Sequence, residues 1–329
     1  MDIVLNILFL FGGFFFLIKG ADLFIVSSRS IARKFNVSPL VIGLTLVAFG
    51  TSLPELGVSF AAALSARQAG ATADIAMGNV IGSNIANITL ILGFSAIMMP
   101  IAVKKSMSRQ EFPFLIVTTV LIGILAFFFQ ADARIVWWEA LILLLFFGYY
   151  IYLMFKSPND HVATEELKVV DTKRAIILLV TGLAGVSIGG YLVTLGAENL
   201  ATSILENFMS KSRAVTLVGL SIVALGTSLP ELVTSVMAAK KGENEIALGN
   251  VVGSNVFNTL LIVGLSGLVT PLRMNNDVLM DIGILFIITL VMVFFSISKQ
   301  SISKREGWIL VSIYFAYITF IIIRALGLF

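Results

Sequence analysis

The seven residues Gly-Thr-Ser-Leu-Pro-Glu-Leu occur twice in the chain, at positions 50–56 and again at positions 226–232. Each copy interrupts a long apolar segment with a proline and a carboxylate. Hydrophobic residues make up 58% of the chain and charged residues only 12%, against about 25% charged residues in soluble domains. A chain this apolar, with a mean hydropathy of +1.01, is predicted to be an all-α integral membrane protein. Both heptapeptides are then expected within the membrane.

A proline and a glutamate inside a transmembrane helix both need a physical reason. Pro54 has no N–H to donate to the Gly50 carbonyl, so the helix is expected to open and to free backbone carbonyls at residues 48–51. A carboxylate costs about 2.5–3.5 kcal/mol at the centre of a membrane helix on insertion scales, and more in simulations. Glu55 and Glu231 both stand in this setting. Two glutamates beside freed carbonyls predict a cation site formed by discontinuous helices.

Apolar stretches of about 20 residues, the length that spans a bilayer, recur along the whole chain. A polar connector at 156–173 divides them into five before it and five after it. We therefore predict a first five-helix repeat at 1–155, the connector, and a second five-helix repeat at 174–329. The ten predicted spans are 3–27, 37–64, 74–100, 112–130, 135–155, 174–198, 213–239, 245–270, 278–297 and 307–326.

A second motif recurs after each Pro-Glu pair. Residues 78–87 and 249–258 agree at seven of ten positions, and their polar residues, spaced by four, share one helix face. Their glycines, at 78 and 82 and at 249 and 253, are expected to let helix backbones approach closely. The polar side chains either line the cation site or only hold helices together, and their recurrence beside two glutamates favours the first. The two stripes are Asn79, Ser83, Asn87 and Asn250, Ser254, Asn258.

The distribution of basic residues predicts the orientation. With the N-terminus outside, the inward loops carry 15 lysines and arginines and the outward segments carry 6. Both termini are therefore expected outside, with the connector in the cytoplasm, in a multi-pass plasma-membrane protein. Five spans per repeat, an odd number, force the two repeats into opposite orientations. Inverted repeats with interrupted helices are typical of secondary transporters, which bind their substrate near the bilayer midplane.

Every candidate ligand in these motifs is a hard oxygen. The chain has no cysteine and one histidine, His161 in the connector, so a soft metal site is poorly supported. Ca²⁺ takes about 6–8 oxygen ligands, and two bidentate glutamates with the carbonyls of Thr51 and Thr227 supply six. Na⁺ accepts the same ligand types, so shared glutamates would make the binding of the two ions mutually exclusive. Nearby hydroxyl groups that could form smaller sites for Na⁺ belong to Ser52, Ser83, Ser228 and Ser254.

Other acidic residues have simpler interpretations. Ser52 and Glu55 match the Ser-x-x-Glu capping box, which would satisfy the start of a helix. A capping box does not explain why a helix is broken at membrane depth, so the cation site is favoured. Asp22 and Glu198 match each other at the offset of 176 that relates the heptapeptides, and they are expected at the membrane interface.

The paired Gly-Thr-Ser-Leu-Pro-Glu motifs, each followed by Gly-Asn-x-x-Gly-Ser-Asn-x-x-Asn, resemble the two α-repeats of the sodium/calcium exchangers, in the Ca²⁺:cation antiporter superfamily. The resemblance covers the whole ten-span layout. It implies that Glu55 and Glu231 are central ligands of Ca²⁺ shared with Na⁺, and that the carbonyls of Thr51 and Thr227 bind Ca²⁺. It also implies flanking sodium sites lined by Ala48, Ser52, Ser83, Ala224, Ser228 and Ser254, with Asn87 and Asn258 at the centre.

Three details refine the resemblance. Some relatives, including potassium-dependent ones, carry an aspartate where this chain has Asn258, so the amide argues against potassium co-transport. Proton-coupled members tend to have Gly-Asn ahead of the glutamate, so Thr-Ser here favours sodium. The connector is too short for the calcium-sensing domain of eukaryotic exchangers, which indicates a prokaryote-type transporter without a regulatory domain.

We predict a Na⁺/Ca²⁺ antiporter that works by alternating access at one midplane site. The resemblance implies that the first span and its repeat partner move against the remaining helices. A Ca²⁺/H⁺ exchanger is the main alternative, and a cation channel is a weaker one. An enzyme is not expected, because the chain has no nucleophile–base pair or cofactor motif. Ca²⁺ and Na⁺ are expected as substrates in a lipid surrounding, without a cofactor, a nucleic acid or a protein partner.

Overall fold

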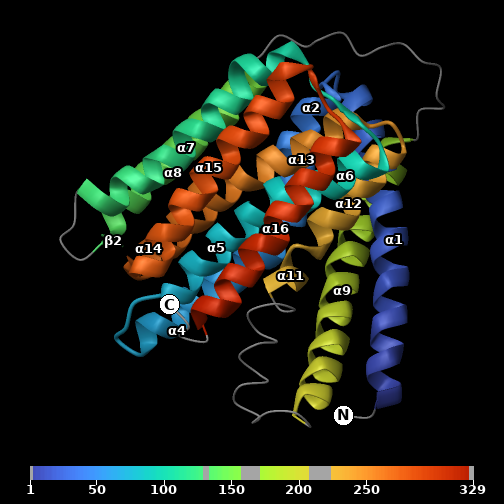
Figure 1. Cartoon of the computed structure of the whole chain (residues 1–329). Helices are drawn as coiled ribbons and strands as arrows, with labels where there is room; N and C mark the ends of the chain where they lie inside the picture. Colours follow the sequence, from blue (N-terminus) through green and yellow to red (C-terminus); the bar gives the residue numbers. More distant parts are fainter. Residues whose placement is uncertain (1–2, 129–132, 157–170, 207–223, 326–329) are drawn as a thin grey trace.

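The computed structural model describes residues 3–128, 133–156, 171–206 and 224–325. These residues fold almost entirely into helices (Figure 1). Among them, eight helices are long and apolar enough to cross a membrane, or nine if the pair Pro39–Thr51 and Leu53–Gln68, bent by 48°, counts as one span. The chain is therefore a multi-pass membrane protein. The remaining predicted span, at 213–239, lies partly outside the described residues.

Two features of the elements were not predicted. Several helices contain wide π-helical turns (η), and four two-residue strands pair into two small antiparallel sheets, β1 with β4 and β2 with β3. In chain order the described elements are α1 (Ile3–Lys34), α2 (Pro39–Ile42), η1 (Gly43–Val47), α3 (Ala48–Thr51), α4 (Leu53–Gln68), α5 (Asp74–Ala86), η2 (Asn87–Ile91), α6 (Leu92–Met98), β1 (Ile101–Ala102), η3 (Met107–Glu111), α7 (Phe112–Phe128), β2 (Arg134–Ile135), α8 (Trp137–Lys156), α9 (Thr172–Leu205), α11 (Ala224–Thr227), α12 (Leu229–Lys240), α13 (Asn244–Val256), η5 (Phe257–Ile262), α14 (Val263–Val269), β3 (Leu272–Arg273), α15 (Asn276–Ser298), β4 (Ser301–Ile302) and α16 (Lys304–Ala325).

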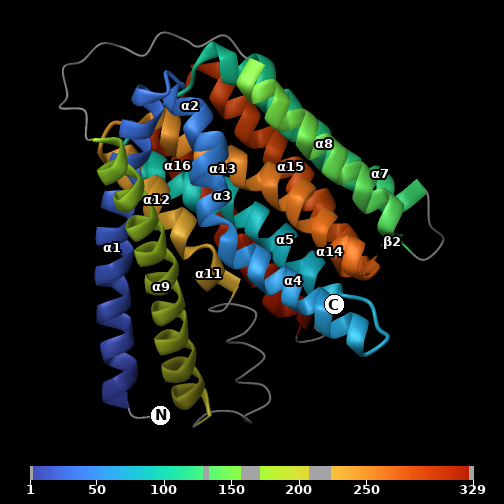
Figure 2. The same cartoon turned by 180° about the vertical axis from the view of Figure 1, so that it is seen from behind.

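The first helix of each half packs against the other. Helices α1 and α9 run antiparallel as a close pair at one side of the molecule (Figures 1 and 2). A Cβ atom on Gly20 would lie 2.6 Å from the backbone nitrogen of Val186, and one on Gly189 would lie 2.5 Å from that of Leu17. Small residues of this kind are what allow two transmembrane helices to approach closely. Both helices extend beyond the predicted spans 3–27 and 174–198.

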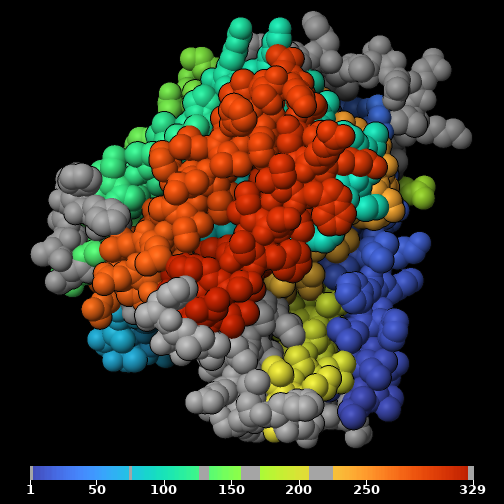
Figure 3. All heavy atoms as spheres, viewed as in Figure 1, coloured from blue at the N-terminus to red at the C-terminus, as the bar shows by residue number. Residues whose placement is uncertain are grey.

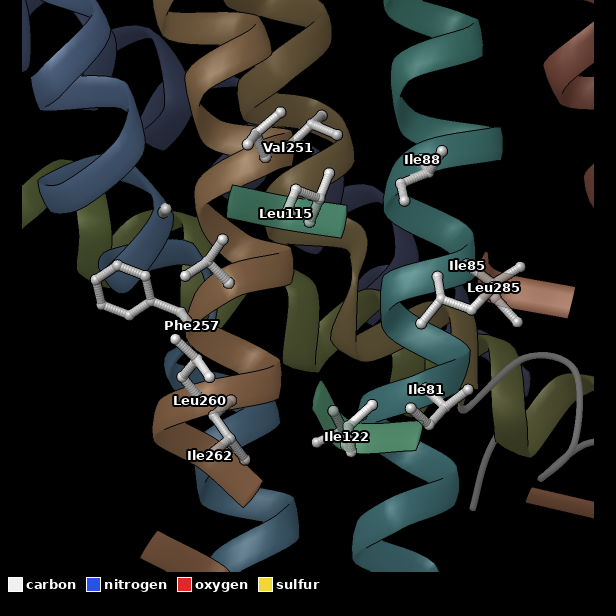
Figure 4. Close-up of a cluster of buried hydrophobic side chains, with 14 of the residues drawn as sticks. Ile81, Ile85, Ile88, Leu115, Ile122, Val251, Phe257, Leu260, Ile262 and Leu285 are labelled. Carbon is white, nitrogen blue, oxygen red and sulfur yellow. The ribbon is translucent and has the colours of Figure 1, made fainter. Parts of the chain in front are cut away.

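Two helical runs lie at the centre of the remaining bundle. The most apolar windows of Ala76–Met98 and Asn244–Val269 are 83% and 94% buried, against 22–39% for the other spans. Figure 4 shows side chains of α5, α7, η5 and α15 meeting between them, among them Ile81, Leu115 and Leu260. Helices α15 and α16 cover one face of this core (Figure 3). The central runs carry the two polar stripes, so the stripes are shielded from lipid.

Two opposite faces of the bundle can be distinguished. The start of α1 and the end of α16 lie at one face, which we call the terminal face (Figure 1). The end of α8 and the start of α9, which flank the connector, lie at the other, which we call the connector face (Figure 1). There the ammonium group of Lys34, at the end of α1, donates to the hydroxyl oxygen of Thr172, at the start of α9.

Candidate cation-binding site

Both Pro-Glu segments are broken at the serine of the heptapeptide. In the first copy α3 ends at Thr51 and α4 begins at Leu53, and Ser52 between them has φ −83° and ψ 5°. In the second copy Ser228, with φ −89° and ψ 4°, separates α11 from α12. The near-identical backbone angles show that the two halves interrupt their helices in the same way. The breaks predicted from the two prolines are confirmed.

The break frees fewer carbonyls than the sequence predicted. The N–H of Ser52 donates to the carbonyl of Ala48 at 3.0 Å, so the prediction is wrong for that carbonyl. The N–H of Leu56 donates to the Ser52 carbonyl at 3.0 Å, which completes the first turn of α4. The missing N–H of Pro54 deprives the Gly50 carbonyl of its helical donor.

The serine at each break reaches across to the glutamate of the other half. The hydroxyl of Ser52 donates to Oε1 of Glu231 at 3.0 Å, and that of Ser228 donates to Oε1 of Glu55 at 3.1 Å. Ser52 makes no capping bond to its own helix, so the capping-box interpretation is wrong. Each glutamate is 1% exposed. The two carboxylates therefore lie close together, buried at the contact between the halves.

The threonines beside the serines occupy the same region. Thr51 is fully buried, and its hydroxyl lies 3.0 Å from Oδ1 of Asn250 and 3.1 Å from the Val47 carbonyl oxygen, either of which can accept its proton. Thr227 is half-buried and lines a cavity together with Pro54 and Pro230. Each threonine ends the helical segment that precedes the break.

Part of each polar stripe holds helices together. Nδ2 of Asn79 donates to Oγ of Ser59 at 2.9 Å, and Nδ2 of Asn250 donates to Oγ of Ser235 at 2.9 Å. Each bond ties a stripe helix to the Pro-Glu helix of its own half, so the packing interpretation is right for these two asparagines. Neither serine was predicted from the sequence. Their signal was present, because each follows a repeated glutamate by four residues.

The other stripe residues supply buried oxygen atoms. The hydroxyl of Ser83 lies 3.4 Å from that of Ser228. Oγ of Ser254, Oδ1 of Asn87 and both amide atoms of Asn258 are buried and have no hydrogen-bond partner among the described residues. Buried polar groups in folded proteins are nearly always paired, so the oxygens among these atoms have the character of cation ligands, whereas Nδ2 of Asn258 can only donate.

The two stripe helices widen at their last asparagine. The turn η2 begins at Asn87, and the N–H of Leu92 donates to the carbonyl of that residue, five positions earlier. In η5 the N–H of Val263 donates to the carbonyl of Asn258, again five positions earlier. Such π-turns inside α-helices are frequent at functional sites. Both halves thus carry a wide turn at an asparagine whose side-chain oxygen has no hydrogen-bond partner among the described residues.

The donor set fits a hard cation as transported cargo. Oε2 of Glu55 and Oε2 of Glu231 are buried without a hydrogen-bond partner, and hydroxyl and amide oxygens surround them. The described residues contain no cluster of three or more His, Cys, Asp or Glu side chains, so the negative charge comes from this carboxylate pair. Ala48 is buried beside the break; Ala224 begins α11, and its side chain lies outside the described residues.

Close approach of the backbones supports the site in one half. A Cβ atom on Gly253 would lie 2.5 Å from the Leu44 carbonyl oxygen, and one on Gly249 would lie 3.0 Å from that of Leu40, as the glycine spacing predicted. A Cβ atom on Gly78 or Gly82 would meet no described atom within 4 Å beyond its own stretch of helix. The segment that would correspond to Leu40 and Leu44 there, at the offset of 176, lies outside the described residues.

Comparisons with known proteins agree with this geometry. The model of the sodium/calcium exchanger protein family matches residues 5–156 and 174–323. The chain is 39% identical over 273 residues to CaxA of Alkalimonas amylolytica, covering 80% of this chain and 81% of the relative. It is 34% identical to the sodium/calcium exchanger MaX1 of Methanosarcina acetivorans, covering 96% of this chain and 98% of that protein.

A solved structure extends the match to the whole fold. The sodium-calcium exchanger NCX_Mj superposes with a TM-score of 0.82 at 31% identity, covering 97% of this chain and 99% of the other. The family is one of transporters, which agrees with the prediction of an antiporter rather than an enzyme. With the family model matched on both sides of the connector, the chain belongs to the sodium/calcium exchanger family.

Proposed function

We propose that the protein exchanges Na⁺ for Ca²⁺ across a membrane by alternating access at one shared site. The observation that carries the proposal is the crossed pair of bonds from Ser52 to Glu231 and from Ser228 to Glu55. Burying a charged carboxylate costs on the order of several kcal/mol of desolvation free energy. A bound cation is needed to offset this cost for the two glutamates. One Ca²⁺ or a set of Na⁺ ions supplies the positive charge, and the two kinds of ion cannot occupy the same oxygens at the same time. This competition couples the two fluxes.

The proposed ligands are the repeated residues around the two helix breaks. Glu55 and Glu231 bind Ca²⁺ together with the carbonyls of Thr51 and Thr227. Hydroxyl and amide oxygens around them complete smaller sites for Na⁺. These flanking ligands are Ser52, Ser83, Ser228, Ser254, Asn87 and Asn258, with the backbone of Ala48 and Ala224; the Ala48 carbonyl would use the lone pair that the Ser52 N–H leaves open.

We further propose that the halves at 1–155 and 174–329 are inverted repeats. Their first helices, α1 and α9, run antiparallel, and the crossed serine bonds and the Asn79 and Asn250 bonds recur in both halves. Alternating access then follows from a movement of the α1–α9 pair against the bundle. The basic loops favour a cytoplasmic connector face and an external terminal face, and the archaeal and bacterial relatives favour a prokaryotic plasma membrane.

The test is Ca²⁺ uptake into liposomes that contain the purified protein. An outward Na⁺ gradient should drive uptake, and an imposed pH gradient without Na⁺ should not. Uptake driven by the pH gradient alone would instead show a Ca²⁺/H⁺ exchanger. Ca²⁺ flux that continues without any counter-ion on the opposite side would show a channel and contradict antiport.

A further inference from the structure

A cavity of about 400 Å³ runs beside the broken helices toward the terminal face. At one end it is lined by Pro54, Thr227 and Pro230, which flank the two glutamates of the site. At the other end it is lined by Glu198. This residue lies seven positions before the end of α9, about 10 Å along the helix axis. Glu198 is the one acidic side chain among the described residues that line the cavity.

A polar face of α9 connects Glu198 with the site. Ser187 and Thr194 line the same cavity, and spacings of seven and four residues place all three side chains on one face of the helix. Thr194 lies directly against the second break, because a Cβ atom on Gly226 would be 2.1 Å from its hydroxyl oxygen. Polar side chains on an otherwise apolar membrane helix commonly mark the path of an ion.

The corresponding face of α1 differs. Subtracting the offset of 176 gives Asp22 for Glu198, but Phe11 and Ile18 for Ser187 and Thr194. Asp22 forms an ion pair with Lys241, which follows the end of α12. One acidic residue of the repeated pair is thus neutralised by a lysine, and the other lies in an open cavity with a hydroxyl-bearing path behind it.

We propose that Glu198 is a recruiting carboxylate for the exchanged cations at the terminal face. Its charge raises the local concentration of Na⁺ and Ca²⁺ at the mouth of the cavity, and the hydroxyls of Thr194 and Ser187 lie along the way to Thr227. Glu198 is not a ligand of the central site. It therefore affects how readily cations reach that site from the terminal face and leaves the exchange step unchanged. The proposal rests on the proposed antiport.

The experiment compares the two faces of the protein in right-side-out and inverted membrane vesicles. With Glu198→Gln, the half-saturating Ca²⁺ concentration at the terminal face should rise about threefold at low ionic strength, as expected when one charge is removed from a focusing cleft. The maximal rate and the value at the connector face should stay unchanged. The difference should shrink at 0.1 M salt and above, where the Debye length falls to about 10 Å.

Two further variants act as controls. Glu198→Asp keeps the charge and should have the wild-type half-saturating Ca²⁺ concentration at the terminal face. Glu206→Gln removes the same charge eight residues further along the chain, outside the residues that line the cavity. It should leave that half-saturating concentration unchanged. An equal shift in Glu206→Gln, or equal shifts at both faces, would overturn the proposal.

The outcomes also separate this inference from the antiport itself. Wild-type vesicles that show no Na⁺-dependent Ca²⁺ exchange would contradict the proposed function. Wild-type exchange with normal half-saturation in Glu198→Gln would contradict only the role of Glu198. A fall in the maximal rate at both faces, without a change in half-saturation, would assign Glu198 to the fold and overturn the proposal.

Discussion

The hydroxyl of Ser228 donates to Oε1 of Glu55 at 3.1 Å, across the boundary between the two halves of the chain. The reciprocal bond, from Ser52 to Glu231, is 3.0 Å long. Each half therefore orients the carboxylate of the other, and neither half contains a complete site. A change on one side of the boundary is expected to alter ion binding on both.

Glu55→Gln tests the need for both negative charges. The variant keeps the size of the side chain but leaves one carboxylate to balance a divalent ion, so Ca²⁺ exchange should be abolished while the protein remains folded. Uptake into liposomes and the elution profile of the purified protein in detergent measure the two properties. Leu53→Ile, next to the break but without a ligand oxygen, is the matched control and should retain exchange. Counter-ion-dependent Ca²⁺ flux in Glu55→Gln would refute the assignment.

Ser52→Ala and Ser228→Ala test the symmetry of the site. Each removes one neutral oxygen of a proposed sodium site and leaves both glutamates in place, a loss of about 0.5–1.5 kcal/mol for a hydrogen-bonding contact. The half-saturating Na⁺ concentration should rise about three- to tenfold in both variants, more than that of Ca²⁺, because each 1.4 kcal/mol is a factor of ten. Ion titrations of exchange measure this. Strongly unequal effects of the two substitutions would argue against equivalent halves.

Asn79→Ala and Asn87→Ala test how the first polar stripe is divided. Asn79→Ala removes the bond to Ser59, and such bonds between membrane helices are worth about 0.6 kcal/mol on average. Its melting temperature should fall slightly while half-saturation stays unchanged. Asn87→Ala should leave the melting temperature unchanged, because Oδ1 of that residue has no protein partner to lose. It should raise the half-saturating ion concentration instead. Thermal unfolding in detergent and ion titration separate the two, and identical behaviour would be inconsistent with the division.

Gly13→Ala and Gly12→Ala test the contact between α1 and α9. A Cβ atom on Gly13 would lie 2.8 Å from both the Gly189 carbonyl oxygen and the Val193 nitrogen, whereas one on Gly12 would meet no described atom within 4 Å beyond its own stretch of helix. Overpacking of this kind costs about 1–3 kcal/mol, so Gly13→Ala should lower thermal stability and slow exchange. Gly12→Ala should behave as wild type. A similar loss of thermal stability in Gly12→Ala and Gly13→Ala would mean that the close contact between α1 and α9 is not the cause.

Much of the architecture could be predicted because its main motifs occur twice in the sequence. Pro54 and Pro230 fix the position of each break, since the missing N–H acts locally whatever surrounds it. The glutamates at membrane depth stand out against an apolar background and mark the site. Within the described residues the predicted apolar segments coincide with helices, although α1 and α9 continue past their hydrophobic parts as ordinary polar-ended helices.

The remaining features depend on contacts that no local pattern records. The π-turns at Asn87–Ile91 and at Phe257–Ile262 were not predicted, because their residues do not differ from ordinary helix formers. Ser52 was ambiguous because the same Ser-x-x-Glu spacing serves a capping box, and only the position of Glu231 decides the matter. Glu198 was expected at the interface, and its cavity is formed by residues of four separate elements, α4, α9, α11 and α12.

Equilibrium Ca²⁺ binding to the purified protein at increasing Na⁺ concentrations tests the central claim most directly. If Glu55 and Glu231 form one site shared by both ions, the apparent Kd for Ca²⁺ should rise steadily with Na⁺ while the number of bound Ca²⁺ at saturation stays constant. An apparent Kd that does not depend on Na⁺ would show that the two ions bind separate sites and would contradict the proposed exchange.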